Sequence, residues 1–209
     1  MDDILKKYSL IQYQNVPRET LIEFDSFISM LTKRNEEINL ISKETAKIEV
    51  IRQRHIMDSA QILDFIDLNE NVITDIGSGG GMPGIIISIM LKNMKKITKV
   101  NLYEKSHHKS SFLRKVSRDL KLNTEVIQKN IFEEQNLESG TIMVRAFKPL
   151  PIVVELVYKN LILFMGKNGE EILKETLNHW DFDYEKKTSI TSKDSFLLNI
   201  KNIKKINKN

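Results

Sequence analysis

The sequence predicts an α/β fold built on a parallel β-sheet. An apolar segment at residues 72–76 leads into a run, residues 76–84, that contains five glycines and is followed by an apolar helical segment. A second apolar segment, residues 99–103, ends immediately before Glu104. Strand, glycine-rich turn, helix and strand in this order are typical of a nucleotide-cofactor site at the carboxyl edge of a parallel sheet.

The rest of the chain continues the alternation of strands and helices. Hydrophobic spacing predicts helices at 84–94, 107–121 and 150–163, and strands at 72–76, 99–103, 125–128, 141–146 and 169–174. Strands that alternate with helices imply parallel pairing through right-handed crossovers. Residues 196–200 are predicted to form a late edge strand.

The first 68 residues carry a helical pattern. Pro17 opens a segment whose apolar side chains lie on one helical face, and Ser42 can cap the next helix. That helix contains His55, and a break is predicted near Asp58. We therefore expect a helical extension at 1–68 that packs on a core unit at 69–209 to give one compact body.

Composition limits the classes of function. The 209-residue chain has a net charge of +4 and a sequence pI near 9.0, which is compatible with a nucleic-acid partner without requiring one. It contains no cysteine, so disulfides and thiolate metal sites are excluded, and we expect a cytoplasmic protein without a bound metal. The N-terminus does not fit a signal peptide. The longest apolar stretch, 85–91, is too short to span a membrane.

The glycine-rich loop predicts a small-molecule cofactor. Gly77, Gly79 and Gly81 alternate directly after the first strand, where glycine lets the backbone approach a ligand or adopt positive φ. The same run contains the dinucleotide pattern Gly79-x-Gly81-x-x-Gly84, and Glu104 lies at the spacing of its ribose-binding carboxylate. Spacing alone therefore leaves S-adenosylmethionine and NAD as alternatives.

Two residues favour S-adenosylmethionine. Asp75 lies two residues before the first glycine, where its carboxylate can face the cationic amino-acid end of that cofactor. Pro83 stands at the opening of the helix, where a pyrophosphate needs N–H donors and proline has none. Glu104 can bind both ribose hydroxyls through charge-assisted hydrogen bonds. The candidate cofactor residues on this basis are Asp75, Gly77, Gly79 and Glu104.

Several short motifs resemble one known family. The loop ends in Met82-Pro83-Gly84, and Arg54-His55-Ile56-Met57-Asp58-Ser59 stands upstream of it. Further matches are Asn39-Leu40-Ile41-Ser42, Lys109-x-x-Phe112-Leu113 and Val144-Arg145-Ala146-Phe147. These motifs resemble the RsmG (GidB) family of small-subunit ribosomal RNA guanine-N7 methyltransferases. The resemblance implies a Rossmann-like class I S-adenosylmethionine-dependent methyltransferase fold with an N-terminal helical extension.

The resemblance also implies roles for individual residues. It places S-adenosylmethionine against Gly77, Met82, Phe132, Glu133 and Arg145, with Glu104 as the ribose carboxylate. Three positions depart from the family pattern. Ile131 stands where an arginine is usual, and Glu175 stands where a glycine usually follows the residue matching Lys174. Arg34 replaces an aromatic residue that is common in the N-terminal helix.

Basic residues near the same edge are candidates for RNA contact. The basic run on the helix at 107–121 is either an ordinary solvated face or a phosphate-binding face. His55 is either a structural histidine bonded to Asp58 or a residue that lines the cofactor or guanine pocket. Arg145 at a strand end needs an anionic partner, which is a cofactor carboxylate, an RNA phosphate or a structural pair. The candidate substrate-binding residues are Arg54, His55, Lys109, Arg114 and Lys174.

The expected activity is methyl transfer from S-adenosylmethionine to N7 of a specific guanosine in 16S ribosomal RNA. The expected substrate is naked RNA or an assembling small ribosomal subunit, and we expect a monomer. Guanine N7 presents an in-plane lone pair, so its methylation requires no general base, thiolate or metal, and no catalytic residue is singled out. Two alternatives stay open: methylation of a small molecule or protein, and a non-catalytic NAD-binding module.

Overall fold

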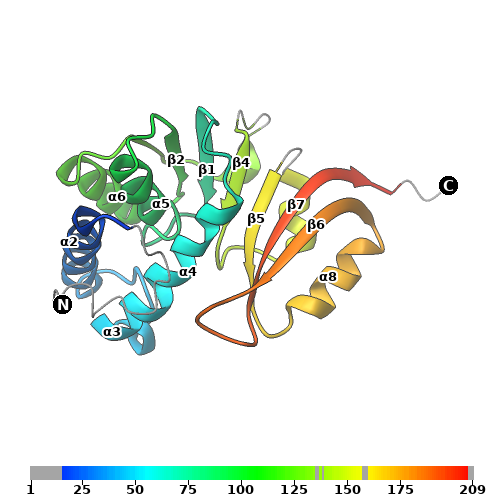
Figure 1. Cartoon of the computed structure of the whole chain (residues 1–209), viewed down its shortest axis with the longest axis horizontal. Helices are drawn as coiled ribbons and strands as arrows, with labels where there is room; N and C mark the ends of the chain where they lie inside the picture. Colours follow the sequence, from blue (N-terminus) through cyan, green and yellow to red (C-terminus); the bar gives the residue numbers. More distant parts are fainter. Residues whose placement is uncertain (1–15, 135–136, 138, 157–159, 207–209) are drawn as a thin grey trace.

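The computed structural model describes residues 16–134, 137, 139–156 and 160–206, and a mixed sheet runs through them (Figure 1). Its strands are β1 (Val72–Ile76), β2 (Lys99–Tyr103), β3 (Thr124–Ile127), β4 (Thr141–Val144), β5 (Asn160–Met165), β6 (Trp180–Thr188) and β7 (Phe196–Lys205). Their order across the sheet is β3-β2-β1-β4-β5-β7-β6. Strands β1 to β5 pair in parallel, whereas β7 is antiparallel to both β5 and β6. The predicted α/β fold is confirmed, with an antiparallel hairpin at one edge.

Helices precede the sheet and connect its strands. They are α2 (Arg18–Asn35), α3 (Ile48–Val50), α4 (Met57–Ala60), α5 (Gly84–Asn93), α6 (His107–Asp119), α7 (Leu150–Val153) and α8 (Gly169–Leu177). Short 3-10 turns lie at Lys43–Thr45, Gln61–Phe65, Ile131–Glu133 and Val154–Leu156, and a π-helix lies at Ile51–Ile56. Helical geometry runs from residue 48 to residue 65, so the break predicted near Asp58 is wrong. Within the described ranges, no helix is long and apolar enough to cross a membrane.

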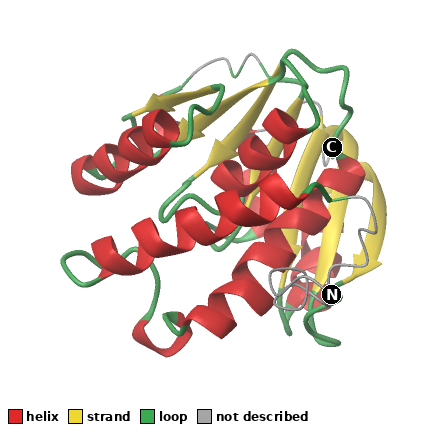
Figure 2. Ribbon diagram, turned by 60° about the vertical axis from the view of Figure 1, so that its left-hand side comes forward, coloured by secondary structure: helices red, strands yellow, loops and turns green. Residues whose placement is uncertain are grey.

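Each face of the sheet has its own hydrophobic cluster, because successive side chains of a strand point to opposite faces. On one face, Ile73, Met143 and Leu197 belong to a cluster that includes side chains of α2, α5 and α6. On the other face, Ile142 and Leu198 belong to a cluster with α7 and α8. Figure 2 shows helices packed along the twisted sheet. Cover on both faces is typical of sheets with parallel strands.

The N-terminal helices are built into the first of these clusters. Pro17 precedes α2, as predicted, and the ring centroid of Phe27 lies 6.5 Å from that of Phe112 on α6. Glu23 on α2 forms an ion pair with Lys92 on α5. The described part of the extension therefore shares a core with the α/β unit, while the division of the chain at residue 69 stays a prediction.

The structure corrects two predicted elements after β4. The helix predicted at 150–163 is helical only as far as residue 156, and its last residues form β5; residues 157–159 lie outside the described ranges. The strand predicted at 169–174 is the helix α8. Periodicity cannot separate a short buried strand from a buried helix, and the run Leu161 to Phe164 is such a case. Glu170 and Glu171 suit the first turn of a helix, where they face its positive end.

The hairpin of β6 and β7 also differs from the prediction. Residues 196–200 do form a strand, but β7 extends to Lys205 and lies between β5 and β6 rather than at the edge. The edge strand is β6, which the sequence pattern missed. Its sequence, WDFDYEKKT, alternates charged and aromatic residues, and most of its side chains are exposed. Charged side chains are a common way to protect an edge strand from further pairing.

The strand order places a crevice at the carboxyl ends of β1 and β4. From β1 the chain moves to β2 and β3 on one side, and then crosses to β4 and β5 on the other side. Ligands of open α/β sheets bind at such a switch point, outside the carboxyl ends of the strands. Here the glycine-rich loop follows β1 and the segment 145–147 follows β4, so both face the crevice.

The start of α5 is packed against β1 and β2 through Gly84. Its N–H donates to Asp75 Oδ2 at 3.0 Å. A Cβ at Gly84 would lie 2.6 Å from that same oxygen and 2.3 Å from Leu102 Cδ2. Only glycine leaves room for the carboxylate and for the close approach of helix to strand.

We predict that Gly84→Ala lowers the free energy of unfolding by about 1–3 kcal/mol, because the added methyl overpacks a closed site. Gly166→Ala is the matched control, since a Cβ there has no neighbour within 4 Å and its φ is not left-handed. Its effect should stay within about 0.5 kcal/mol. Urea denaturation of both variants and the wild type measures the difference. Equal stability of the two variants would contradict the packing described for Gly84.

Candidate active site

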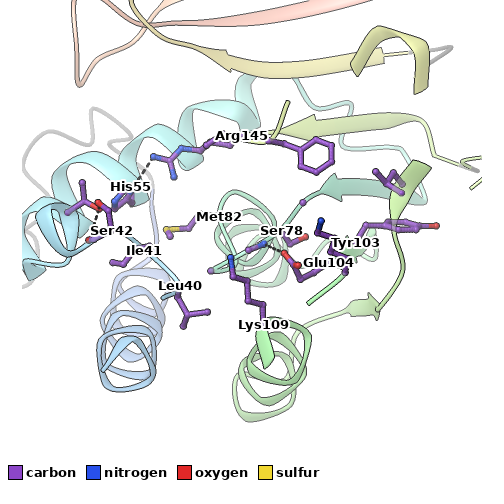
Figure 3. A pocket seen from close by; sticks show the side chains of 18 of the residues that line it. Leu40, Ile41, Ser42, His55, Ser78, Met82, Tyr103, Glu104, Lys109 and Arg145 are labelled. Carbon is purple, nitrogen blue, oxygen red and sulfur yellow. Dashed lines mark hydrogen bonds between the residues drawn. The ribbon is translucent and has the colours of Figure 1, made fainter. Parts of the chain in front are cut away.

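A cavity of about 540 Å³ opens at the crevice between β1 and β4 (Figure 3). Its floor is the glycine-rich loop, and its walls come from the ends of β2 and β4, the segment 129–131 and the π-helix. The segment 40–45, which follows α2, closes one side. The candidate residues that line the cavity are Arg54, His55, Gly77, Gly79, Met82, Glu104, Lys109 and Arg145.

Three glycines of the loop have left-handed backbone conformations. The φ angles are 71° at Gly77, 52° at Gly79 and 92° at Gly81. The amides of Gly77 and Ser78 donate to the carbonyl oxygen of Tyr103, at 2.9 and 3.0 Å, which ties the loop to the end of β2. Residues other than glycine rarely adopt these angles, so the alternation of glycines is a requirement of the loop's shape.

Glu104 directly follows β2, lies against the glycine-rich loop and is anchored at both carboxylate oxygens. Oε2 accepts the N–H of Gly79 at 3.0 Å, and Oε1 accepts the N–H of Ser106 at 2.8 Å. The side chain is buried but still lines the cavity. Each carboxylate oxygen has a second lone pair, so Glu104 can accept further hydrogen bonds from a ligand.

Asp75 lies beneath the loop rather than in the cavity. It is 1% exposed, and burial is the largest cause that raises its pKa, to about 7; the nearby Glu104 charge raises it further. Hydrogen bonds with Ser78 and Gly84 oppose the shift. Its Oδ1 is buried without a hydrogen-bond partner among the described residues. Asp75 is thus not among the residues that line the cavity, and it holds the end of the loop through the Gly84 amide. Its contact with a cofactor stays a prediction.

Arg145 extends from the end of β4 toward the π-helix. Its Nη2 lies 2.8 Å from His55 Nδ1 (Figure 3). The same atom lies 3.4 Å from Asp58 Oδ2. The histidine is thus bonded to Arg145, so the interpretation of His55 as a partner of Asp58 is wrong. Arg145 has a protein carboxylate, Asp58, as a partner, which confirms the structural pair. It also lines the cavity, and its contact with a cofactor carboxylate or an RNA phosphate stays a prediction.

The loop between β6 and β7 supports this cluster from the other side. Ser189 and Thr191 both donate hydroxyl hydrogen bonds to Asp58 Oδ1, the first at 3.4 Å. Gln61 accepts the N–H of Ile190 at 3.0 Å. Burial raises the pKa of Asp58, whereas the Thr191 hydrogen bond and the Arg145 charge lower it. Sequence reasoning missed Ser189 and Thr191, because nothing local in the sequence marks a contact across more than 130 residues.

His55 is electrically neutral in this environment. Burial lowers its pKa to about 4, with further lowering by the charges of Arg145 and Arg54. Since Arg145 can only donate, His55 Nδ1 accepts and the proton of the neutral ring is on Nε2. Nε2 is buried and has no partner among the described residues.

Phe132 and Glu133 flank the cavity without lining it. The Phe132 ring stacks on that of Phe147, with 5.9 Å between centroids and an interplanar angle of 19°. Glu133 Oε1 accepts from Asn130 Nδ2 at 3.3 Å. The neighbouring Ile131 does line the cavity, so the family's usual arginine is replaced by an apolar wall.

The substrate candidates divide into two groups. Arg54 and Lys109 line the mouth of the cavity, with Arg54 exposed and Lys109 half-buried. Arg114 is exposed on α6 and does not line the cavity. Lys174 is exposed on α8, because the strand predicted to carry it is a helix, and it does not line the cavity either.

Comparison with known proteins identifies the family. The family model described as rRNA small subunit methyltransferase G matches residues 20–202. A relative from Pelagibacter ubique, named ribosomal RNA small subunit methyltransferase G, is 74% identical over 99% of this chain and 100% of its own length. A relative of the same name from Rickettsia felis is 35% identical over 91% of this chain and 98% of its own length. The chain belongs to this family. It is therefore an S-adenosylmethionine-dependent ribosomal RNA methyltransferase, and the alternative of a non-catalytic NAD-binding module is wrong.

The structural neighbours agree on the fold. A MtNAS mutant in complex with S-adenosylmethionine superposes with a TM-score of 0.53 at 13% identity, covering 88% of this chain and 76% of the other. Together with the sheet order, this likeness confirms the predicted class I methyltransferase fold with helices before the sheet.

We predict that His55 stays neutral until the pH falls to about 4. In the unfolded chain His55 takes up this proton near pH 6.5. Neutral His55 therefore contributes to the stability of the fold above pH 6.5. That contribution is lost as the pH falls from 6.5 to about 4, because the unfolded state then binds the proton and the folded state does not. Nitrogen-15 NMR of labelled histidines measures the pKa and the tautomer, with His55→Gln to assign the signal. Arg145→Ala should raise the pKa of His55. A pKa near 6.5 in the wild type would contradict the burial described here.

Proposed function

We propose that this protein methylates N7 of a specific guanosine in 16S ribosomal RNA, with the methyl donor bound in the cavity at the switch point. The observation that carries the proposal is a left-handed glycine loop and a carboxylate anchored to it, which together line one cavity. A ligand can approach the backbone of Gly77 and Gly79 closely, and the Glu104 carboxylate can accept further hydrogen bonds from it. We further propose that the enzyme acts as a monomer in the cytoplasm, on naked RNA or on an assembling small subunit.

The cavity suggests an orientation for S-adenosylmethionine. Glu104 binds the ribose hydroxyls, and the adenine lies toward Ile131, next to the pair Phe132 and Glu133. The carboxylate of the methionine portion lies toward Arg145, a half-buried cation that lines the cavity. Met82 and the loop glycines contact the donor between these ends. This orientation pairs the carboxylate of the donor with a guanidinium and its ribose hydroxyls with a carboxylate.

The start of α5 supports S-adenosylmethionine over NAD. A pyrophosphate binds free amides at a helix N-terminus. Here the Gly84 amide is committed to Asp75 Oδ2, and the Ile85 amide donates to the Gly81 carbonyl at 2.8 Å. Gly80 lies against the segment after α2, since a Cβ on it would be 3.2 Å from the Leu40 carbonyl oxygen. The place that a pyrophosphate needs is therefore closed.

The reaction requires alignment more than proton transfer. When bound, S-adenosylmethionine supplies an electrophilic methyl group, which passes to the N7 lone pair as the carbon–sulfur bond breaks. Orientation of two reactants can contribute on the order of 7–11 kcal/mol to a rate. The neutral state of His55 keeps a further positive charge away from the reacting centre, where positive charge moves to the guanine ring. No residue needs to accept a proton.

Methyl transfer to ribosomal RNA from cells that lack this gene tests the proposal. Purified protein with radiolabelled S-adenosylmethionine should label 16S RNA at one guanosine, and mapping of the product should locate the methyl group at N7. Naked RNA and isolated small subunits are assayed in parallel to separate the two substrates. Calorimetry with S-adenosylhomocysteine and with NAD is the cofactor control. Labelling of an unrelated small molecule or protein, with none of RNA, would overturn the proposal.

We predict that Lys109 contributes one RNA phosphate contact at the mouth of the cavity. Lys109→Ala/Arg114→Ala should weaken RNA binding and reduce the slope of log affinity against log salt by roughly one to two, and the single variants separate the two residues. Lys201→Ala/Lys204→Ala is the matched control, because both lysines are exposed on β7 and lie outside the cavity lining. If the two double variants reduced RNA affinity and its salt slope equally, Lys109 and Arg114 would contribute only through the net charge of the protein.

A further inference from the structure

A second cavity, of about 490 Å³, lies beside the first at the same edge of the sheet. It is formed at the carboxyl ends of β4 and β5 and at the starts of α7 and α8. Apolar side chains, including Leu150, Leu163 and Ile172, form its walls, and the exposed residues Lys148 and Lys167 belong to its rim. Its volume falls within the usual range of small-ligand pockets, roughly 300–1,000 Å³.

The two cavities share Ala146 and Phe147 as a common wall. The Phe147 ring is held against the loop glycine, since a Cβ on Gly77 would lie 2.4 Å from Phe147 Cδ2. The stacked ring of Phe132 supports it further. An aromatic side chain fixed by these contacts forms a boundary between the two spaces.

Ala146 has a backbone conformation that is unusual for a residue with a side chain. Its φ is 50°, in the left-handed region that costs a non-glycine residue roughly 1–3 kcal/mol. Residues held in such conformations concentrate at functional sites. The strained residue of this edge is thus at the junction of the two cavities, directly after Arg145.

We propose that the second cavity receives the target guanosine, flipped out of its RNA, so that Phe147 and Ala146 separate the base from the methyl donor except where the methyl group passes. This inference rests on the proposed function and extends it to the acceptor. Enzymes that modify a base take it out of the stack and into a pocket. The acceptor must approach the donor in line, with reacting atoms about 3–3.5 Å apart. The second cavity shares Ala146 and Phe147 with the first, so a base held there lies next to the bound donor.

The lining suits a nucleotide. A purine is planar and apolar on its faces, which matches the walls of Leu150 and Ile172 and the edge of Phe147. The flanking phosphates are anionic, which matches the ammonium groups of Lys148 and Lys167 at the rim. Asn168 is exposed beside them and offers an amide that can both donate and accept hydrogen bonds at a base edge.

Gly166 allows the second cavity to be filled without touching the first. It lines only the second cavity, and a Cβ there has no neighbour within 4 Å. The test is the series Gly166→Ala, Gly166→Leu and Gly166→Trp, assayed for single-turnover methyl transfer to 16S RNA from cells that lack this gene. Side chains of increasing size should slow transfer progressively, with little effect for alanine and a loss of roughly 10- to 100-fold for tryptophan. Affinity for S-adenosylhomocysteine, measured by calorimetry, should not change.

Asn178→Trp is the matched control, because Asn178 is exposed at the far end of α8 and lines neither cavity. It should methylate RNA at the wild-type rate. If Gly166→Trp fails to fold, as judged by lost S-adenosylhomocysteine binding, Gly166→Leu decides the question. Wild-type transfer rates across the whole series would overturn the acceptor site while leaving the proposed function intact. A wild-type protein that does not methylate this RNA would overturn the proposed function instead.

Discussion

The geometry of the site depends on two buried carboxylates that hold the glycine-rich loop. Asp75 accepts the amide of Gly84 at the end of the loop, and Glu104 accepts the amide of Gly79 in its middle. Burying a charged carboxylate is unfavourable, and for this reason the pKa of Asp75 is raised to about 7. Backbone amides offset part of this cost, so the loop and the carboxylates stabilise one another.

The Arg145 cluster joins three distant parts of the chain beside the first cavity. Arg145 follows β4, Asp58 belongs to the N-terminal helices, and Thr191 belongs to the loop between β6 and β7. Removing one member of a buried charge pair is costly, because the other is left without compensation. The helical extension is for this reason part of the site rather than an addition to the fold. The extension also packs against the glycine-rich loop, where Leu40 lies next to Gly80 and lines the cavity.

Prediction from the sequence succeeded where the signal is local. The loop, β1, β2 and Glu104 follow from glycine spacing and two apolar segments, because neighbouring residues determine their geometry. It failed at 150–177, where short apolar runs fit helix and strand equally and where the wrong choice gave Lys174 a place at the sheet edge. Contacts such as Ser189 with Asp58 and the stacking of Phe132 on Phe147 exist only after folding brings the segments together. No pattern within either segment indicates them.

The arrangement of the two cavities follows from the chemistry of the acceptor. A ring nitrogen with a free lone pair needs no base, so a site for it can be built from walls that align two reactants rather than from groups that move protons. Two titratable residues near the crevice agree with this: His55 is held neutral, and Asp75 lies under the loop and does not line the cavity. What distinguishes this site from a proton-transfer site is therefore rigidity. The Phe147 ring, fixed between Gly77 and Phe132, and the strained Ala146 beside it are the rigid elements at the point where donor and acceptor would meet.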